Sequence, residues 1–179
     1  VLKADITNPA NYRAAEKLDQ WLKKRNIVGI TGIDTRALTA RIRENGMPDG
    51  VIAHSPDGYF HEPSIMAELN AFPGLVGLDL AKEVSTAQTY HWDQSRWHWG
   101  KGYGTVENPE FHIVAIDYGA KRNILRSPAT DGARVTVVPA TATAAEILAH
   151  KPDGIFLSNG PGDPAATGKY AVPVIKKLI

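Results

Sequence analysis

The sequence predicts an α/β protein in which an N-terminal α+β region precedes the first half of a doubly wound, mostly parallel sheet. Three apolar runs rich in β-branched residues lie in the second half, at residues 111–116, 134–140 and 154–159. Two segments of helical character, residues 120–126 and 143–151, separate them. Strands that alternate with helices at a spacing of about twenty residues indicate right-handed βαβ units, with a sheet covered on both faces. Such sheets bind ligands at the carboxyl ends of their strands.

The first half of the chain has a different pattern, with amphipathic helices and two short β-branched runs. The helices are predicted over residues 8–26, 34–46 and 62–72, and the strands over residues 27–33 and 50–54. In the second helix, Asp34 or Thr35 supplies the N-cap, while Leu38 and Ile42 face inward.

The segment between the two halves contains more extended structure and a linker. Residues 80–92 are expected to be extended in their second half, and the aromatic run at residues 90–100 is interpreted as a twisted strand that packs its tryptophans. Residues 97–109 are rich in Gly and polar side chains and are interpreted as a linker. Pro173 falls near the last predicted helix and is tolerable only in its first turn. Pro128 follows the helical segment at residues 120–126 and should end or kink that helix.

Composition excludes several classes of function. The net charge of +1 over 179 residues gives no basic surface that implies a nucleic-acid partner. With no cysteine present, disulfides, thiolate metal sites and a cysteine nucleophile are excluded within these residues, and the six histidines show no metal-ligand spacing. No apolar run is long enough to span a membrane and no signal peptide is found, so we expect a cytoplasmic protein without a membrane partner. Because the sequence begins at Val1 and stops inside a predicted helix, we expect an excerpt of a longer polypeptide.

The stretch SNGPGDP, residues 158–164, is the strongest candidate for a functional site. Gly160 and Gly162 lack Cβ, so the backbone can approach a ligand closely and adopt positive φ, while Pro161 fixes its own φ and has no N–H. The exposed glycine N–H groups of such a rigid loop can point at a developing oxyanion, where one donor contributes about 3–4 kcal/mol of transition-state stabilisation. A tight turn at a strand exit, without chemistry, explains the same residues.

Four further features have a functional and a structural interpretation, and in each we favour the structural one. The IDTR run at residues 33–36 pairs an acid with a base but also suits a helix cap with a surface ion pair. The AKRN run at residues 120–123 places two cations at a helix start, which suits an anion or an acidic partner surface but also a solvated helix face. The GKGYGT run at residues 100–105 lacks the ending of a phosphate loop and suits a linker. The aromatics of residues 90–100 suit packing better than stacking on bases.

The second half resembles a class I glutamine amidotransferase domain, whose third strand is followed by the loop that SNGPGDP matches in full. Three further segments, IDYGAKRNILR (116–126), GIDTRALTARIRENG (32–46) and GLDLAKEVS (77–85), resemble the small, glutamine-hydrolysing subunit of carbamoyl phosphate synthetase. The resemblance runs over nearly the whole chain. It implies a partial N-terminal domain for subunit contact at residues 1–105, a linker at 106–110, and a truncated amidotransferase domain at 111–179.

The resemblance also implies an activity. In this family a cysteine attacks the glutamine amide, and the ammonia released passes to a large subunit that makes carbamoyl phosphate from bicarbonate with ATP and Mg²⁺, for arginine and pyrimidine synthesis. Gly160 would supply an oxyanion-hole N–H, and both Gly160 and Gly162 would contact glutamine. No cofactor is expected in this chain itself.

The chain departs from the family pattern at one essential point. The nucleophilic cysteine, the histidine and the glutamate of the family come after the helix that ends at Ile179, so we expect residues 1–179 alone to be inactive. Two alternatives stay open, a non-catalytic docking module and another class I amidotransferase of the anthranilate or GMP type. Residues 1–105 argue against the latter, because those enzymes lack this N-terminal domain.

Overall fold

The computed structural model describes residues 1–179, which form two compact units, Val1–Gly74 and Leu75–Ile179. The predicted domain boundary at residues 106–110 does not coincide with this division. Residues 75–105 belong to the second unit because their strand and hairpin pair and pack with elements beyond residue 110. The predicted domains, which follow the family resemblance, stay a prediction.

The second unit is built on a four-stranded, mostly parallel sheet, as predicted. Its parallel strands are β4 (Phe111–Asp117), β5 (Ala133–Pro139) and β6 (Gly154–Leu157), and the short β1 (Tyr90–Trp92) is antiparallel to β5. The order across the sheet is β1-β5-β4-β6. All three predicted parallel strands are confirmed. Within residues 80–92, helix α4 (Leu80–Val84) comes first and β1 follows, which confirms that the second half of this segment is extended.

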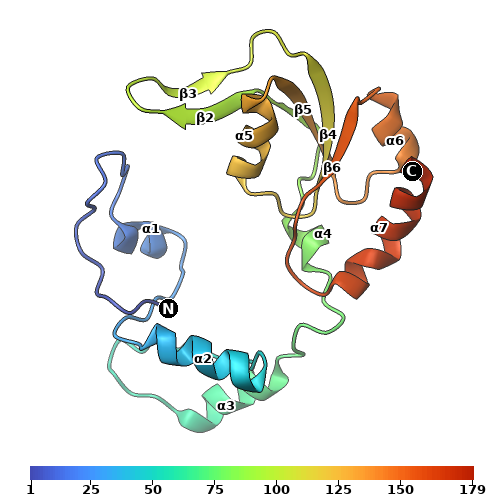
Figure 1. The fold of residues 1–179 in the computed structure, drawn as a ribbon. Coiled ribbons are helices and arrows are strands. Elements are labelled where there is room, and N and C mark those ends of the chain that lie inside the picture. The colour runs from blue at the N-terminus through green and yellow to red at the C-terminus, as the bar shows by residue number, and fades with distance from the viewer. The chain divides into compact units, whose positions relative to one another are not determined.

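Helices cover both faces of this sheet (Figure 1). Helix α5 (Arg122–Thr130) lies on one face, and α6 (Ala144–Ala149) and α7 (Pro164–Leu178) lie on the other. Because successive strand residues point to opposite faces, the two cores alternate along β4 and β5. Val114, Ile116 and Val138 pack toward α6 and α7, and Ala115, Val135 and Val137 pack toward α5. No helix in the structure combines the length and the apolar character that crossing a bilayer requires.

Pro128 and Pro173 both lie inside helices, which differs from the sequence prediction. Helix α5 continues past Pro128 to Thr130, and α7 begins at Pro164, so Pro173 is nine residues into the helix rather than in its first turn. Pro173 and Lys169, whose carbonyl loses its N–H partner, are both exposed residues. Pro128 lies in the last turn, where Asp131 N–H still bonds to the Ser127 and Pro128 carbonyls.

The predicted linker at residues 97–109 is wrong over most of its length, because it contains a hairpin. Strands β2 (Gln94–His98) and β3 (Gly102–Thr105) pair antiparallel, and Gly100 and Gly102 adopt φ values of 75° and 77° at the turn. The glycines that suggested a flexible linker therefore serve a tight reversal that needs positive φ. The predicted packing of tryptophans is confirmed only in part: the rings of Trp97 and Trp99 meet edge to face at 5.9 Å, but Trp99 is 78% exposed.

The first unit consists of three helices joined by irregular segments. They are α1 (Leu18–Lys24), α2 (Thr35–Asn45) and α3 (Glu62–Ala71). The second and third agree with the prediction, whereas the first is much shorter than residues 8–26. The predicted strands at 27–33 and 50–54 are absent. A strand needs a paired neighbour, and the backbone of the first of these runs bonds only to Leu2, at Ile30 and Ile33, and to the preceding helix, from Ile27 N to Leu22 O.

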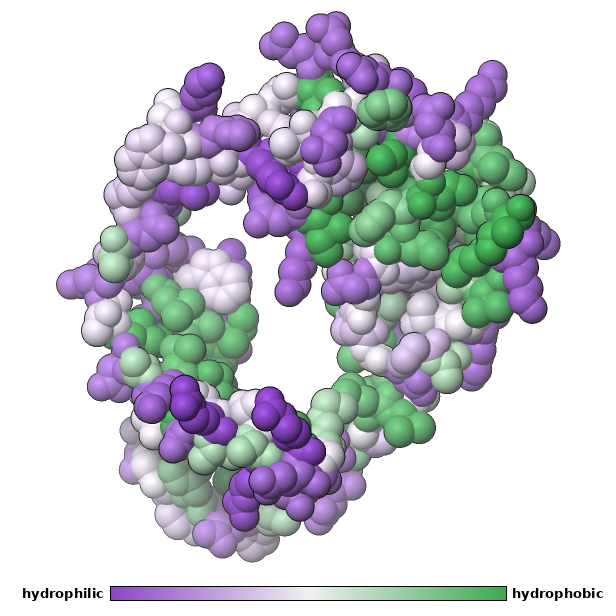
Figure 2. Space-filling model, viewed as in Figure 1, coloured by the Kyte–Doolittle hydropathy of each residue, from purple (hydrophilic) through white to green (hydrophobic).

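No side chain of residues 1–74 is fully buried in the structure. Leu38 and Ile42, predicted to face inward, are 39% and 37% exposed, so that prediction is wrong. Figure 2 shows hydrophobic residues at the surface of this unit, which Figure 1 draws in blue to blue-green. Without a sheet to pack on, the apolar faces of these helices remain accessible.

Candidate functional site

The Gly-Pro-Gly loop, residues 158–164, leaves β6 at the carboxyl end of the parallel strands, as the sequence predicts. It lies against the turn that leaves the neighbouring strand β4. A Cβ at Gly160 would stand 2.2 Å from the Tyr118 carbonyl oxygen and 3.0 Å from Tyr118 Cβ. Across the contact, a Cβ at Gly119 would stand 3.1 Å from Pro161 Cδ. The two strand-exit turns therefore pack backbone to backbone, which only glycine allows at residue 160.

The second glycine of the loop is required by both its conformation and its surroundings. Gly162 has φ 86°, and a Cβ there would lie 2.6 Å from the Leu78 carbonyl oxygen and 2.9 Å from Leu80 N. Neither the Gly160 nor the Gly162 N–H donates to an acceptor within the chain. The loop is thus held by close packing, while two backbone donors are left for a ligand.

Buried polar side chains hold the strand ends beneath the loop. The Ser158 hydroxyl accepts from Tyr118 N (2.8 Å) and donates to the Asn159 carbonyl (2.9 Å). The Asp117 carboxylate, only 7% exposed, accepts from the N–H groups of Thr86 (2.8 Å), Gly119 (2.9 Å) and Ala120 (2.7 Å). These bonds fix both turns that meet at Gly160.

Sequence reasoning did not single out Asp163, which joins the loop to a segment far away in the sequence. Its Oδ2 accepts from Gly77 N (2.8 Å) and its Oδ1 accepts from Ala165 N (2.8 Å), so it also caps α7. These two N–H donors, Gly77 first, lower the pKa of the Asp163 carboxyl. The signal available in the sequence was an Asp directly before a helical Pro, which is a common helix start.

A cavity of about 240 Å³ lies beside the loop, α4 and α7. Its lining combines the loop with small residues of the helices and one aromatic residue: Tyr118, Gly160, Gly162, Thr167, Gly168 and Ala171. Burial raises the pKa of the Tyr118 hydroxyl, which therefore stays protonated at neutral pH. The lining contains no cysteine, histidine or carboxylate. The Gly160 and Gly162 N–H groups have no acceptor within the chain, and the cavity lining holds no nucleophile-and-base pair.

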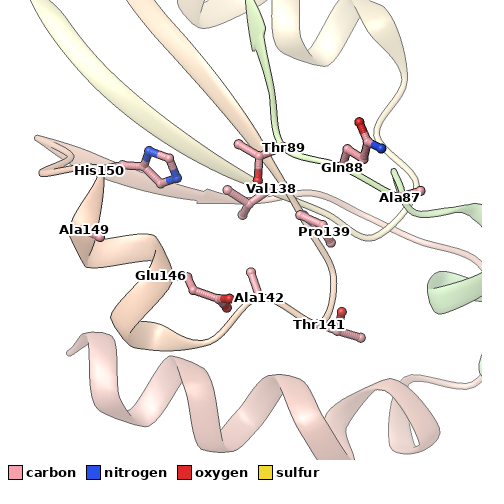
Figure 3. Close-up of a pocket in the computed structure, with 10 residues that line it drawn as sticks. All are labelled: Ala87, Gln88, Thr89, Val138, Pro139, Thr141, Ala142, Glu146, Ala149 and His150. Carbon is pink, nitrogen blue, oxygen red and sulfur yellow. The ribbon is translucent and has the colours of Figure 1, made fainter.

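A larger cavity, about 490 Å³, lies between α6 and the segment before β1 (Figure 3). Its acidic residue, Glu146, is engaged by Thr143, whose N–H and hydroxyl both donate to the Glu146 carboxylate (2.7 and 2.8 Å). Its histidine, His150, packs edge to face on His112 at 6.5 Å. Both polar groups have structural roles, so this cavity is not the candidate site.

None of the other features that the sequence singled out lines the cavity beside the loop. Asp34 is the N-cap of α2 and accepts from Arg36 N and Ala37 N, which confirms the cap, but no salt bridge joins it to Arg36. Lys121 and Arg122 are exposed at the start of α5, as expected for a solvated face. Residues 100–105 form the β2–β3 turn and β3 rather than a phosphate loop.

Comparison with known proteins agrees with the motifs. Residues 1–52 match the family described as carbamoyl-phosphate synthase small chain, CPSase domain, and residues 114–179 match glutamine amidotransferase class-I. The carbamoyl phosphate synthase small chains of Mesorhizobium japonicum and Rhizobium meliloti are 63% and 61% identical to it, and that of Bradyrhizobium diazoefficiens is 58% identical. Each of these matches covers 100% of this chain and 45% of the relative, so the chain spans less than half the length of these relatives.

Proposed function

The chain belongs to the carbamoyl phosphate synthase small chain family, and on that premise we propose that the full-length protein hydrolyses glutamine to supply ammonia for carbamoyl phosphate synthesis. The observation that carries the proposal is the loop at the end of β6. It presents the Gly160 and Gly162 N–H groups without an internal acceptor, in a turn too tightly packed for any side chain at residue 160.

The loop residues take two roles in this proposal. The Gly160 N–H stabilises the oxyanion that forms when the glutamine amide carbon is attacked, and Gly160 and Gly162 together contact the bound glutamine. A rigid donor suits this step because it needs no reorganisation as charge develops on the oxygen. The packing of Gly160 on Tyr118, and of Gly162 on the segment around Leu78, supports such rigidity.

The remaining catalytic groups are proposed to lie outside residues 1–179. The chain has no cysteine, so we expect these residues by themselves to show no glutaminase activity. We propose that the ammonia passes to a large-subunit partner, which uses ATP and Mg²⁺, and that this chain holds no cofactor of its own. The product would serve arginine and pyrimidine synthesis in the cytoplasm.

The proposal is tested with the full-length protein bound to its large-subunit partner. Wild-type complex should hydrolyse glutamine, and Gly160→Ala should lower glutamine-dependent turnover by about 100-fold because the donor is displaced. Gly154→Ala is the matched control, since a Cβ there meets nothing closer than Ile113 Cγ1 at 3.9 Å. Turnover with free ammonia reports on the partner subunit and should be the same in both variants. A wild-type complex that binds the partner without hydrolysing glutamine would support the docking-module alternative instead.

A further inference from the structure

Asp163 makes two kinds of contact with its single carboxylate. Through Oδ1 it accepts from Ala165 N (2.8 Å), which is the ordinary bond of a helix N-cap. Through Oδ2 it accepts from Gly77 N (2.8 Å), and its own N–H donates to the Leu78 carbonyl (2.9 Å). The second set joins the Gly-Pro-Gly loop to a segment 86 residues earlier in the chain.

The segment joined in this way, residues 77–80, is also the surface on which the loop rests. The bare Cα of Gly162 faces it so closely that a Cβ would meet Leu78 O at 2.6 Å and Leu80 N at 2.9 Å. A shift of residues 77–80 would therefore move Gly162, and with it the direction of the loop N–H groups.

A second carboxylate fixes the same segment to α7. Asp79 accepts from the Tyr170 hydroxyl (3.0 Å) and the Thr167 hydroxyl (3.4 Å), while it also accepts from Lys82 N as the N-cap of α4. Residues 77–80 are thus bonded to the N-cap of α7, at Asp163, and to its first two turns, at Thr167 and Tyr170.

We propose that Asp163 is a positioning residue, which holds the Gly160 and Gly162 N–H groups in register by binding residues 77–80. The inference rests on the proposed glutaminase function, because it assigns Asp163 to the geometry of that oxyanion site. A residue that only capped α7 would be replaceable by any good N-cap, whereas a positioning residue needs both carboxylate oxygens.

Serine separates the two roles. It caps helices about as well as aspartate, so Asp163→Ser keeps the bond to Ala165 N, but its single, shorter hydroxyl cannot also bind Gly77 N. Asp163→Asn retains one carbonyl oxygen and can satisfy one of the two N–H groups. The matched control is Asp34→Ser, which makes the same change at the N-cap of α2 in the first unit.

The experiment measures kcat and KM for glutamine in the full-length complex, together with turnover on free ammonia. We expect Asp163→Ser to lower glutamine-dependent kcat by about 10-fold to 100-fold, the range that a displacement of about 1 Å produces. Asp163→Asn should fall between Asp163→Ser and wild type, and Asp34→Ser should match wild type. Ammonia-dependent turnover should be unchanged in all of them.

A second readout does not depend on activity. Amide hydrogen exchange at Gly77 should quicken in Asp163→Ser while exchange within α7 stays the same, because only the bond to Gly77 is lost. Tyr170→Phe, which removes one bond to Asp79, should quicken exchange in residues 77–80 as well.

The outcomes distinguish this inference from the function on which it rests. If wild-type complex does not hydrolyse glutamine, the proposed function fails. If it does, and Asp163→Ser keeps wild-type kcat with wild-type exchange at Gly77, then Asp163 is a cap only and the inference is overturned. Loss of exchange protection across α7 as well would show that serine fails to cap the helix, and Asp163→Asn, which caps well, then decides the question by its kcat.

Discussion

At the scale of single residues, the conformation of the loop depends on the absence of a Cβ in glycine. Gly160 and Gly162 occupy positions where a Cβ would meet backbone atoms at 2.2 and 2.6 Å, which no side-chain movement can relieve. Gly154, in the strand just before them, has room for a methyl group. The requirement for glycine is therefore local to the loop and arises from two neighbouring backbone segments, Tyr118–Gly119 and Leu78–Leu80.

We expect His112 to make the stability of the fold depend on pH. It lies near the start of β4, whereas the Tyr118–Gly119 segment follows the end of that strand. It is 8% exposed, its Nε2 lies 2.8 Å from the Thr136 hydroxyl, and its Nδ1 reaches no hydrogen-bond partner. Burial, followed by the charge of Arg134, lowers the pKa of His112 below its usual 6.5, and the His150 backbone and Asp153 offset this only in part. The His150 ring charge acts in the same direction as burial.

We expect the free energy of unfolding to decrease as the pH is lowered from 6.5 toward the lowered pKa of His112. In the unfolded chain His112 takes up a proton near pH 6.5, whereas in the fold it does so only at lower pH, so the unfolded state binds more protons in between. The contribution of neutral His112 is complete above pH 6.5 and is lost as pH falls from there to the lowered pKa. Urea unfolding of the chain from pH 8 to pH 5 measures this. His112→Gln should flatten the profile, and His54→Gln, at an exposed histidine, should leave it unchanged; equal slopes for wild type and His112→Gln would contradict the assignment.

At the scale of elements, helix α7, which follows the loop, contains two residues of low helix propensity. Helix α7 contains both Gly168 and Pro173, and it begins with Asp163 and Pro164, which together form a strong start. A Cβ at Gly168 would meet only Val172 Cγ2, at the ordinary contact distance of 3.7 Å. The helix is therefore fixed by its first turn and its packing rather than by intrinsic propensity.

Gly168→Ala should stabilise the second unit by about 1 kcal/mol, because alanine loses less backbone entropy than glycine in a helix interior and meets no clash here. Urea unfolding followed by circular dichroism gives the change in the free energy of unfolding. Gly162→Ala, six residues earlier, is the informative counterpart: its φ of 86° and its contact with Leu78 O predict destabilisation. A destabilising Gly168→Ala would show that the cavity it lines cannot accept a methyl group.

At the scale of the whole molecule, the two units differ in how much they bury. The second unit contains two apolar clusters, one on each face of its sheet, in which Val114, Val135 and Val137 are 0% exposed. Residues 1–74 bury no side chain fully, although they include apolar residues such as Met47 and Phe60, which are 69% and 48% exposed. Packing, and hence resistance to local opening, is concentrated in the second unit.

Hydrogen exchange of the 179-residue chain should show this contrast directly. Amides of β4 and β5 are expected to exchange only on global unfolding of the second unit, whereas amides of α1, α2 and α3 should exchange orders of magnitude faster because few buried contacts oppose their opening. Mass spectrometry of peptic peptides gives both rates in one experiment. Protection of α2 equal to that of β4 would contradict the expectation.

Much of the second unit could be predicted because its signals are local and strong. The segments that form β4, β5 and β6 are apolar and rich in β-branched residues. The loop after β6 is indicated by the sequence Gly160-Pro161-Gly162. The N-cap of α2 at Asp34 could also be predicted from the sequence. The hairpin β2–β3 was missed because Gly100 and Gly102 suit a linker and a tight reversal alike. The two strands predicted in the first unit are absent, because β-propensity forms no strand without a paired neighbour.

By itself, the sequence determined the parallel sheet, the Gly-Pro-Gly loop at its carboxyl edge and the family resemblance, because each depends on residues adjacent in the chain. Only the tertiary structure decided that residues 75–105 join the second unit, that Asp117 and Ser158 hold the strand ends, and that Asp163 binds Gly77. These contacts join residues 31 to 86 positions apart. No local pattern encodes which distant N–H a carboxylate will accept, since that choice is made by the packing that brings the two segments together.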